Sequence, residues 1–290
     1  MRVCCLDNLQ LGKRRNIAHL EGVGGFRFVE GDVLDRTFLD AFCFENRFDA
    51  VFHLVANSDI STGTRDPELD LRLNFQTTVN ILDVMRRHGF SRIFFASTSA
   101  VFGETDSSFS EDSGPLQPIS FYGASKLAAE AYLSAHAHLS GIQVMVLRFP
   151  NVVGERATHG VIFDFLRKLE TNRRELEVLG DGLQTKPYLY VGDLVDAIFV
   201  AWDKTSSRFA VYHAAGIGVT SVREIAEIVV AAAGGPETRI RYTGGDRGWP
   251  GDVPRFQYDT TRLQTLGWQP RRHSTDAVRL AVTRILAGGF

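Results

Sequence analysis

A tyrosine and a lysine four residues apart, Tyr122 and Lys126, have the residue types and the spacing for proton transfer. Side chains at this spacing share one helix face, and the sequence from Tyr122 to Leu139 predicts a helix. An unperturbed tyrosine has a pKa of about 10, so acting as a base near neutral pH requires lowering it by about three units, or about 4 kcal/mol. A lysine ammonium fixed nearby can supply much of that change. The pair is a candidate acid–base site, with a solvated helix face as the alternative interpretation.

A hydroxyl-rich segment, Ser97-Thr98-Ser99, follows the predicted strand Ile93–Ala96 upstream of this pair. One of these hydroxyls could bind a substrate oxygen beside the phenol. The segment therefore supplies the chemical context that a tyrosine and a lysine alone lack.

This set of residues resembles the Ser/Thr, Tyr-x-x-x-Lys constellation of the extended short-chain dehydrogenase/reductase family, in particular its NAD-dependent nucleotide-sugar epimerases and dehydratases, and most of all the UDP-glucose 4-epimerase-like proteins. The resemblance extends from Val3 to about Pro270. It implies that Tyr122 is the catalytic base, that Lys126 lowers the pKa of the phenol and binds the cofactor ribose, and that Thr98 hydrogen-bonds the reacting oxygen. Thr98 is chosen over its neighbours because the catalytic hydroxyl of the family stands four residues before an aromatic residue, here Phe102.

Composition narrows the classes of partner. The 290 residues are 44% hydrophobic and 23% charged, which is typical of a globular protein large enough for two domains. A formal net charge of −2 provides no general attraction for nucleic acid or an anionic membrane. The three cysteines lack metal-ligand spacing, and no apolar run reaches the roughly 20 residues that span a bilayer. We expect a cytoplasmic protein with no metal, nucleic-acid or membrane partner.

Strand and helix patterns alternate along the chain, which predicts an α/β fold with a parallel sheet covered on both faces. The resemblance makes this a Rossmann-like doubly wound sheet with a smaller C-terminal substrate-binding domain. It places residues 1–153 in the NAD-binding domain and 154–290 mainly in the substrate-binding domain, with 186–216 returning to the sheet. The expected helices are Arg14–Glu21, Arg36–Phe44, Pro67–His88, Tyr122–Leu139 and Val222–Ala233.

Acidic residues end the first two predicted strands. Asp7, followed by Asn8, would accept the adenosine ribose hydroxyls and repel a 2′-phosphate, which favours NAD over NADP. By the resemblance, Asp32 would accept from the adenine amine. Both aspartates could instead be turn or helix-capping residues. The resemblance assigns further cofactor contacts to Val33, Leu54, Val55, Ala56, Asn74, Phe149 and Pro150.

The substrate residues implied by the resemblance are Thr98, Asn151, Lys186, Arg247 and Asp252. Relatives commonly have arginine at the place of Lys186, and a lysine can contact a phosphate only as a point charge. Arg247 would hold the diphosphate of a nucleotide sugar, most simply a UDP-sugar. The resemblance also implies a homodimer that pairs the helices Pro67–His88 and Tyr122–Leu139.

The start of the pattern departs from the family. A dinucleotide-binding domain begins with a strand, a Gly-rich turn and a helix whose amides hold the pyrophosphate. Gly22-Val-Gly24-Gly25 is no substitute, because it follows a predicted helix and precedes a strand. Loss of that central strand would leave two strands with unpaired edges. Either a truncated start or a degenerate relative fits, and the intact downstream motifs favour truncation. We expect this chain to fold or bind NAD less well than one extended upstream.

Three functions compete. The first is an NAD-dependent nucleotide-sugar epimerase that oxidises a sugar hydroxyl to a ketone and reduces it again on the other face. A 4,6-dehydratase would carry Asp-Glu directly after its threonine, where this chain has Ser99 and Ala100; a reductase is the related alternative. The third is a non-catalytic NAD- or nucleotide-binding relative, which the missing Gly-rich turn would favour.

Overall fold

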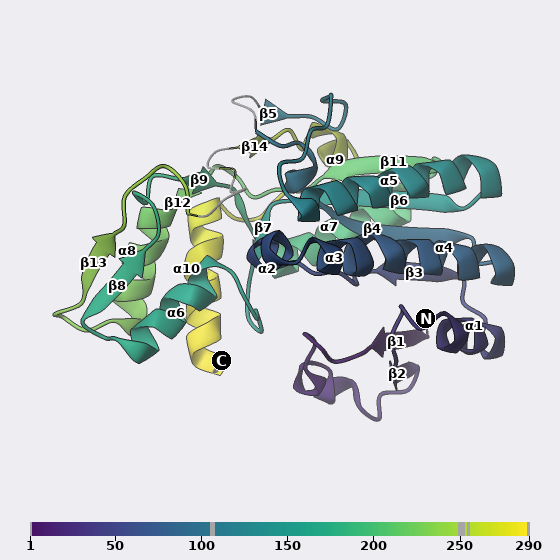
Figure 1. Ribbon diagram of the computed structural model, residues 1–290, viewed down its shortest axis with the longest axis horizontal. Helices are drawn as coiled ribbons and strands as arrows, with labels where there is room; N and C mark the ends of the chain where they lie inside the picture. Colours follow the sequence, from purple (N-terminus) through teal and green to yellow (C-terminus); the bar gives the residue numbers. More distant parts are fainter. Residues whose placement is uncertain (1, 105–107, 249–252, 254–255, 289–290) are drawn as a thin grey trace.

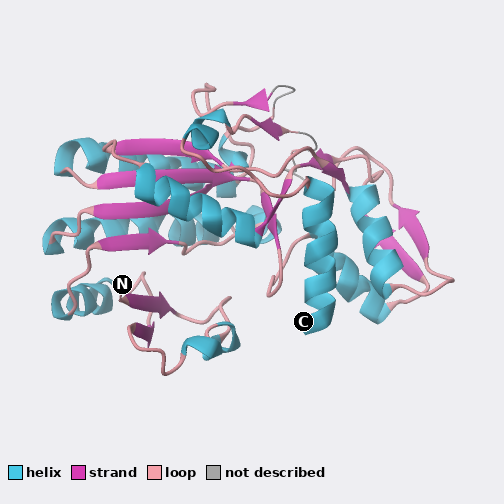
Figure 2. Ribbon diagram, turned by 180° about the vertical axis from the view of Figure 1, so that it is seen from behind, coloured by secondary structure: helices cyan, strands magenta, loops and turns pink. Residues whose placement is uncertain are grey.

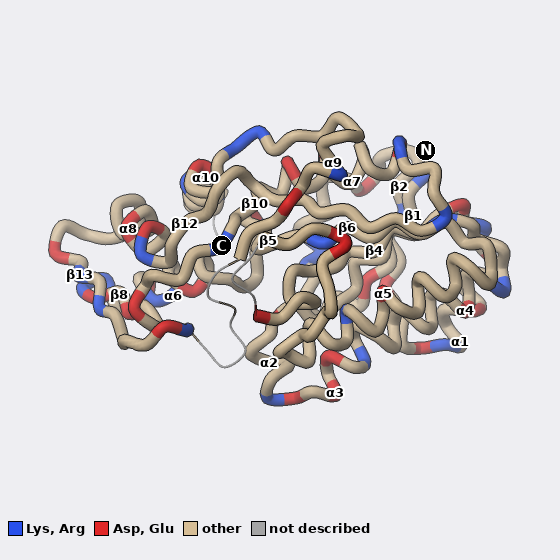
Figure 3. The backbone as a smooth tube through the Cα atoms, turned by 90° about the horizontal axis from the view of Figure 1, so that it is seen from above, with Lys and Arg blue, Asp and Glu red and all other residues tan. Residues whose placement is uncertain are grey.

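The computed structural model describes residues 2–104, 108–248, 253 and 256–288. Figure 1 shows two groups of elements: a sheet flanked by helices, and a smaller group built around α6, α8 and α10. Figure 3 shows Lys and Arg interspersed with Asp and Glu in both groups, as the small net charge of −2 suggests. Among the described residues, no helix is long and apolar enough to cross a bilayer.

Four parallel strands form the central sheet, in the order β11-β6-β4-β3. The two middle strands, β4 and β6, are largely buried, and Ile93, Phe94 and Phe95 in β4 have no exposed surface. Helices cover one face in front and the other behind (Figures 1 and 2). This arrangement confirms the predicted doubly wound parallel fold. The strands are β3 (Ala50–His53), β4 (Arg92–Thr98), β6 (Gln143–Phe149) and β11 (Phe209–His213); the helices are α1 (Arg36–Glu45), α2 (Ile60–Arg65), α3 (Pro67–Asp70), α4 (Thr77–His88) and α5 (Phe121–Ser140) on one side, and α7 (Val191–Lys204) and α9 (Thr261–Thr265) on the other.

Two further strands, β1 (Val3–Asp7) and β2 (Phe26–Glu30), pair in parallel with each other and form a separate sheet. Within the described residues, no backbone ladder joins β1 to β3. Leu6 packs against the core beneath α4 and α5, but Leu54, just after β3, is 62% exposed. The break in strand pairing therefore lies where the sequence pattern lacks a central strand.

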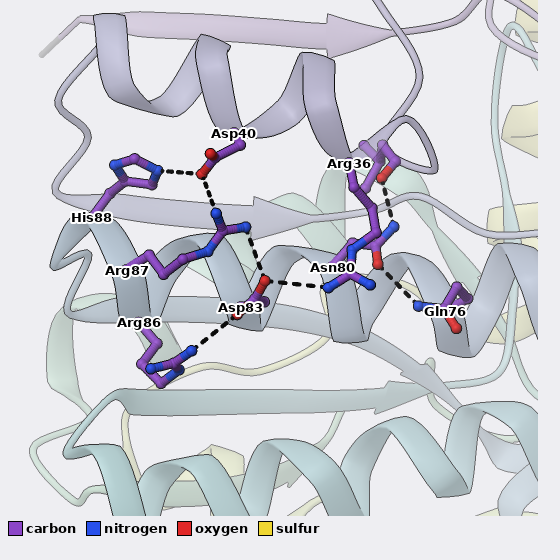
Figure 4. Close-up of polar contacts among 9 residues, drawn as sticks. Arg36, Asp40, Gln76, Asn80, Asp83, Arg86, Arg87 and His88 are labelled. Carbon is purple, nitrogen blue, oxygen red and sulfur yellow. Dashed lines mark hydrogen bonds and ion pairs between the residues drawn. The ribbon is translucent and has the colours of Figure 1, made fainter.

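Polar side chains fasten α1 to α4 where that ladder is missing (Figure 4). Asp40 of α1 accepts from Arg87 at 2.6 Å and contacts His88 Nε2 at 2.8 Å. Arg36 of α1 pairs with Asp83 of α4 at 3.4 Å, and Asn80 Nδ2 donates to the Val33 carbonyl at 3.0 Å. Exposed ion pairs of this kind contribute about 0–1 kcal/mol each. The β1–β2–α1 unit is thus held by side chains, without a continuous sheet.

Two predicted helices differ from those observed. The segment expected as a helix over Arg14–Glu21 forms two 3₁₀ turns, Arg14–Asn16 and Ala18–Leu20. Arg14 stacks on Phe28 at 4.5 Å and pairs with Glu21 at 2.9 Å, which favours a tight bend, and so short a helix is marginal by itself. The predicted helix Pro67–His88 contains a π-helical turn, Leu71–Gln76, between α3 and α4.

The smaller group of elements has its own apolar core. Its centre contains Phe165, Leu176, Ile225, Val278 and Ile285, all 5% exposed or less. This core is separate from those of the sheet, which supports the proposed domain division near residue 153. Although β11 follows that position in the sequence, it pairs with β6 in the main sheet. The elements are β7 (Asn151–Val153), α6 (Val161–Thr171), β8 (Glu175–Val178), β9 (Thr185–Lys186), β10 (Tyr188–Tyr190), β12 (Thr220–Ser221), α8 (Val222–Ala233), β13 (Arg239–Tyr242) and α10 (Ser274–Gly288); a short pair, β5 (Ser108–Phe109) and β14 (Gln257–Tyr258), lies near the end of the sheet.

Candidate active site

The amino end of α5 packs directly against the turn that follows β4. Ser120 caps the helix by accepting from the Gly123 amide at 3.1 Å. A Cβ at Gly123 would lie 2.3 Å from the Ala100 carbonyl oxygen, so this approach requires glycine. The contact brings Thr98, the last residue of β4, to Tyr122, and their side chains hydrogen-bond. The candidate base and the hydroxyl chosen to bind the reacting oxygen are therefore neighbours.

The phenol of Tyr122 does not have the lowered pKa that the spacing suggested. Burial raises its pKa to about 12, the hydrogen bond with Thr98 lowers it in part, and the charge of Asp70 raises it further. The protein alone therefore keeps Tyr122 protonated at neutral pH. The loss of solvent around the phenol is the largest of these effects on its pKa.

Lys126 lies inside the protein with 2% of its surface exposed. Its Nζ donates to the Ala96 carbonyl at 3.1 Å and lies 4.7 Å from the centre of the Phe95 ring. Burial lowers its pKa to about 8, against the charges of Glu130 and Asp70, which raise it. An ammonium has three N–H groups, so Lys126 retains donors for a ligand beside the phenol.

Asn74, predicted to contact the cofactor, is fully buried. The π-helical turn carries it beneath α5, where its Nδ2 donates to Asp70 Oδ1 at 3.1 Å and to Ser125 Oγ at 3.2 Å. Asn57 also donates to Asp70, at 2.7 Å. A Cβ at Gly63 would lie 1.9 Å from Asp70 Oδ2, so glycine makes room for this carboxylate. The structure thus shows Asn74 supporting the residue before Lys126.

The acidic residues of the first two strands do come together. Asn8 Nδ2 donates to Asp32 Oδ2 at 3.3 Å, and Asp7 Oδ1 accepts from the Leu9 amide at 2.6 Å. Asp35, and not Asp32, caps α1. Asp7 and Asp32 therefore form a cluster with Asn8 at the carboxyl ends of β1 and β2. Val33 is buried directly after it.

The remaining predicted cofactor residues lie along the same edge of the fold. Leu54, Val55 and Ala56 follow β3, and Pro150 follows Phe149, which is the partner of Thr98 across β4 and β6. The residues present fit the two ends of a dinucleotide, with carboxylates for a ribose at one end and a phenol and an ammonium at the other. For the pyrophosphate between them, the described residues contain no Gly-rich turn from strand to helix.

The predicted substrate residues are less closely grouped. Asn151 begins β7 and is exposed, while Lys186 is buried in β9, two residues before the cross-strand partner of Asn151. Arg247 forms an ion pair with Glu104 in the loop after the Thr98 turn. Asp252 lies outside the described residues.

Sequence reasoning missed three buried charges around the site: Asp70, Glu130 and Arg148. The positions of two of these residues in the sequence could have indicated their burial. Glu130 stands four residues after Lys126 on the buried side of α5, and Arg148 interrupts an otherwise apolar strand. The imidazole of His53 in β3 is also buried, and its Nε2 lies 2.9 Å from Thr78 Oγ1.

Residues 1–218 match the sequence pattern of the NAD dependent epimerase/dehydratase family. This chain belongs to that family. NAD is therefore the cofactor to which its site is suited.

Among the family's members, a UDP-glucose 4-epimerase from Mycolicibacterium smegmatis is 30% identical over 275 residues, covering 92% of this chain and 85% of the relative. A dTDP-glucose 4,6-dehydratase from Streptomyces griseus is 30% identical over 284 residues, covering 97% and 84%. A crystal structure of UDP-galactose 4-epimerase is 32% identical, with a TM-score of 0.87, and covers 100% of this chain and 92% of that one. Family likeness thus includes both epimerases and dehydratases.

The raised pKa of Tyr122 can be tested without a substrate. We expect the ultraviolet difference between the wild type and Tyr122→Phe to show no tyrosinate from Tyr122 up to about pH 10, because its folded pKa is about 12. Titration is followed by tyrosinate absorbance, with circular dichroism as a control for unfolding. A tyrosine that ionises near neutral pH in the wild type and is missing in the variant would contradict this result.

Proposed function

We propose that this chain is an NAD-dependent nucleotide-sugar epimerase, resembling UDP-glucose 4-epimerase, with a UDP-sugar as substrate. The observation that carries the proposal is the contact of Thr98 with Tyr122, beside the buried Lys126, at the carboxyl end of a doubly wound sheet. Ligands of such sheets bind at this edge. Membership of the family and likeness to epimerases over nearly the whole chain support it.

When bound, NAD supplies a hydride acceptor and, in its oxidised form, a positive charge. Tyr122 Oη takes the proton from a sugar hydroxyl and returns it when the ketone is reduced on its other face. Thr98 hydrogen-bonds both the phenol and the reacting oxygen. Lys126 is charged below about pH 8, so it stabilises the phenolate that burial disfavours.

In this proposal, Asp7, Asn8 and Asp32 hold the adenosine end of NAD, and Lys126 holds the nicotinamide ribose. The predicted substrate residues Asn151, Lys186, Arg247 and Asp252 bind the nucleotide sugar. Arg247 would exchange Glu104 for the diphosphate, an exchange that costs little because this ion pair is partly exposed.

The dehydratase alternative requires an acid and a base that eliminate water. Ser99 and Ala100 begin the 3₁₀ turn after Thr98 and carry no carboxyl group. The dehydratase from Streptomyces griseus is as similar in identity as the epimerase, so overall likeness does not separate the two. The local residues favour epimerisation. A reductase or a non-catalytic relative stays an alternative that turnover assays distinguish.

The first test is turnover. Purified protein with NAD is incubated with a panel of UDP-sugars, and the products are resolved by chromatography. We expect Tyr122→Phe to lower turnover by at least about 100-fold, because it removes the proton acceptor, while sugar-nucleotide binding stays nearly unchanged. Tyr242→Phe, the same change in β13 of the smaller group of elements, is the matched control. A Tyr122→Phe variant with near-wild-type turnover would exclude this tyrosine as the base.

A second test separates epimerase from dehydratase. Because Ser99 and Ala100 carry no acid or base, we expect the product to have the same mass as the substrate. Mass spectrometry of the sugar nucleotide before and after reaction measures this. A product lighter by one water would show a dehydratase, and net oxidation or reduction of NAD would show an oxidoreductase.

We further propose the homodimer that the sequence predicted, through α3–α4 and α5. Support comes from exposed apolar residues on these elements: Leu71 is 54% exposed, Phe121 52%, Tyr132 48% and Leu139 87%. Tyr132 packs edge-on against Phe75 at 4.9 Å, so the two elements share this surface. A second copy that covered it would bury a substantial apolar area.

Light scattering at micromolar concentration tests the dimer. We expect a mass near twice the 32.2 kDa of one chain. Tyr132→Lys should shift it toward one chain by placing a charge in the interface, whereas Phe44→Lys, at an 80% exposed position on α1, should not. A single-chain mass for the wild type would refute the proposal.

A further inference from the structure

Glu130 and Arg148 form a buried ion pair between α5 and β6 that the mechanism above does not use. Each side chain is 5% exposed. Arg148 Nε lies 3.0 Å from Glu130 Oε1, and Nη2 lies 2.6 Å from Oε2, so the contact is bidentate. Nη1 of Arg148 is buried without a partner in the described structure.

The pair contacts both flanks of the segment that contains Thr98. Ser97, the residue before it, donates its hydroxyl to Glu130 Oε1. Phe102, at the end of the following turn, lies under the Arg148 guanidinium at 5.0 Å. Ser97 and Arg148 are also direct partners across β4 and β6. Movement of either charged side chain would therefore displace the strand end that presents the Thr98 hydroxyl.

Glu130 also acts on Lys126. It stands one helical turn further along α5, where side chains four residues apart face each other. The Asp70 carboxylate from α3 also acts on the Lys126 ammonium. His53 from β3 faces it too, with a pKa lowered to about 3 by burial and by the lysine charge, so it is neutral. Glu130 and Asp70 are thus the two anions that oppose the burial of the ammonium.

Stability alone is a weak explanation for this pair. Replacing a buried ion pair by apolar residues of similar volume is often neutral or stabilising, because desolvation offsets the attraction between the charges. The geometry here connects the pair to the proposed site in two ways: Ser97 donates to Glu130 Oε1, and the Glu130 charge acts on Lys126. Its position points to a role in the reaction.

We propose that Glu130 and Arg148 are positioning residues, which hold the Thr98 segment through Ser97 and Phe102 and keep the Lys126 ammonium charged beside Tyr122. The proposal rests on the function assigned above to Thr98, Tyr122 and Lys126. In this proposal, both residues act through Ser97, Phe102 and Lys126 and not on the substrate itself.

The decisive variant is Glu130→Gln, which preserves shape and removes the charge. Lysine-labelled protein is titrated by NMR, and the Lys126 Cε resonance is assigned with Lys126→Met. We expect the midpoint to move to lower pH by about one unit, because one of two anions near the ammonium is lost. The alkaline limb of turnover should move in the same direction. An unchanged Lys126 midpoint would overturn the electrostatic part of the proposal.

Ser97→Ala separates positioning from charge. It leaves the ion pair in place, so the Lys126 midpoint should stay at its wild-type value. Turnover should fall about tenfold with little change in KM, because Thr98 loses its support but the substrate contacts remain. Wild-type turnover in Ser97→Ala would overturn the positioning part.

A control is Asp193→Asn, which changes the buried partner of a partly buried ion pair, with Arg272 at 2.6 Å, at the start of α7. It should lower the melting temperature without moving the Lys126 midpoint. If Glu130→Gln does not fold, the double variant Glu130→Gln/Arg148→Met leaves no uncompensated charge and should show the same lower midpoint. The NMR readout needs no substrate, so failure of the proposed reaction and failure of this inference are distinguishable.

Discussion

The close packing of α5 on the end of β4 is the contact on which the rest of the site depends. It exists because Gly123 has no side chain to meet the Ala100 carbonyl. From this contact follow the hydrogen bond between Thr98 and Tyr122 and the burial of Lys126 beneath the same helix. A bulkier residue at position 123 would push the helix away and separate the phenol from the hydroxyl. One small residue therefore determines whether the acid–base groups meet.

Burial shifts the pKa values of Tyr122 and Lys126 away from those of the free side chains, in directions that oppose ionisation. Enclosure raises the pKa of Tyr122 to about 12 and lowers that of Lys126 to about 8, so each charged form is disfavoured in the protein alone. The Asp70 carboxylate has opposite effects on the two groups: it helps to keep the lysine charged, but it makes the phenol harder to ionise. A site built in this way needs a further positive charge to favour the phenolate, and the oxidised cofactor brings one.

The two ends of the cofactor site are supported differently. The proposed catalytic end stands on a continuous ladder from β3 to β11, whose middle strands β4 and β6 are largely buried. The proposed adenosine end, at Asp7 and Asp32, stands on a two-stranded unit that side chains such as Asp40 and Arg87 attach to α4. Side-chain contacts on a partly exposed surface resist displacement less than a backbone ladder does. We therefore expect the side chains of the proposed catalytic end to be held more rigidly than those of the proposed adenosine end.

The sequence by itself determined the family, the alternating fold and the spacing of Tyr122 and Lys126, because these depend on local order along the chain. Only the tertiary structure decided what surrounds them. Spacing shows that two side chains share a helix face, but their desolvation depends on segments far away in sequence. The raised pKa of Tyr122 and the burial of Asn74 could therefore not be predicted from spacing. The partners Glu130 and Arg148, on α5 and β6, and the ion pair between Arg247 and Glu104, 143 residues apart, exist only once the chain has folded.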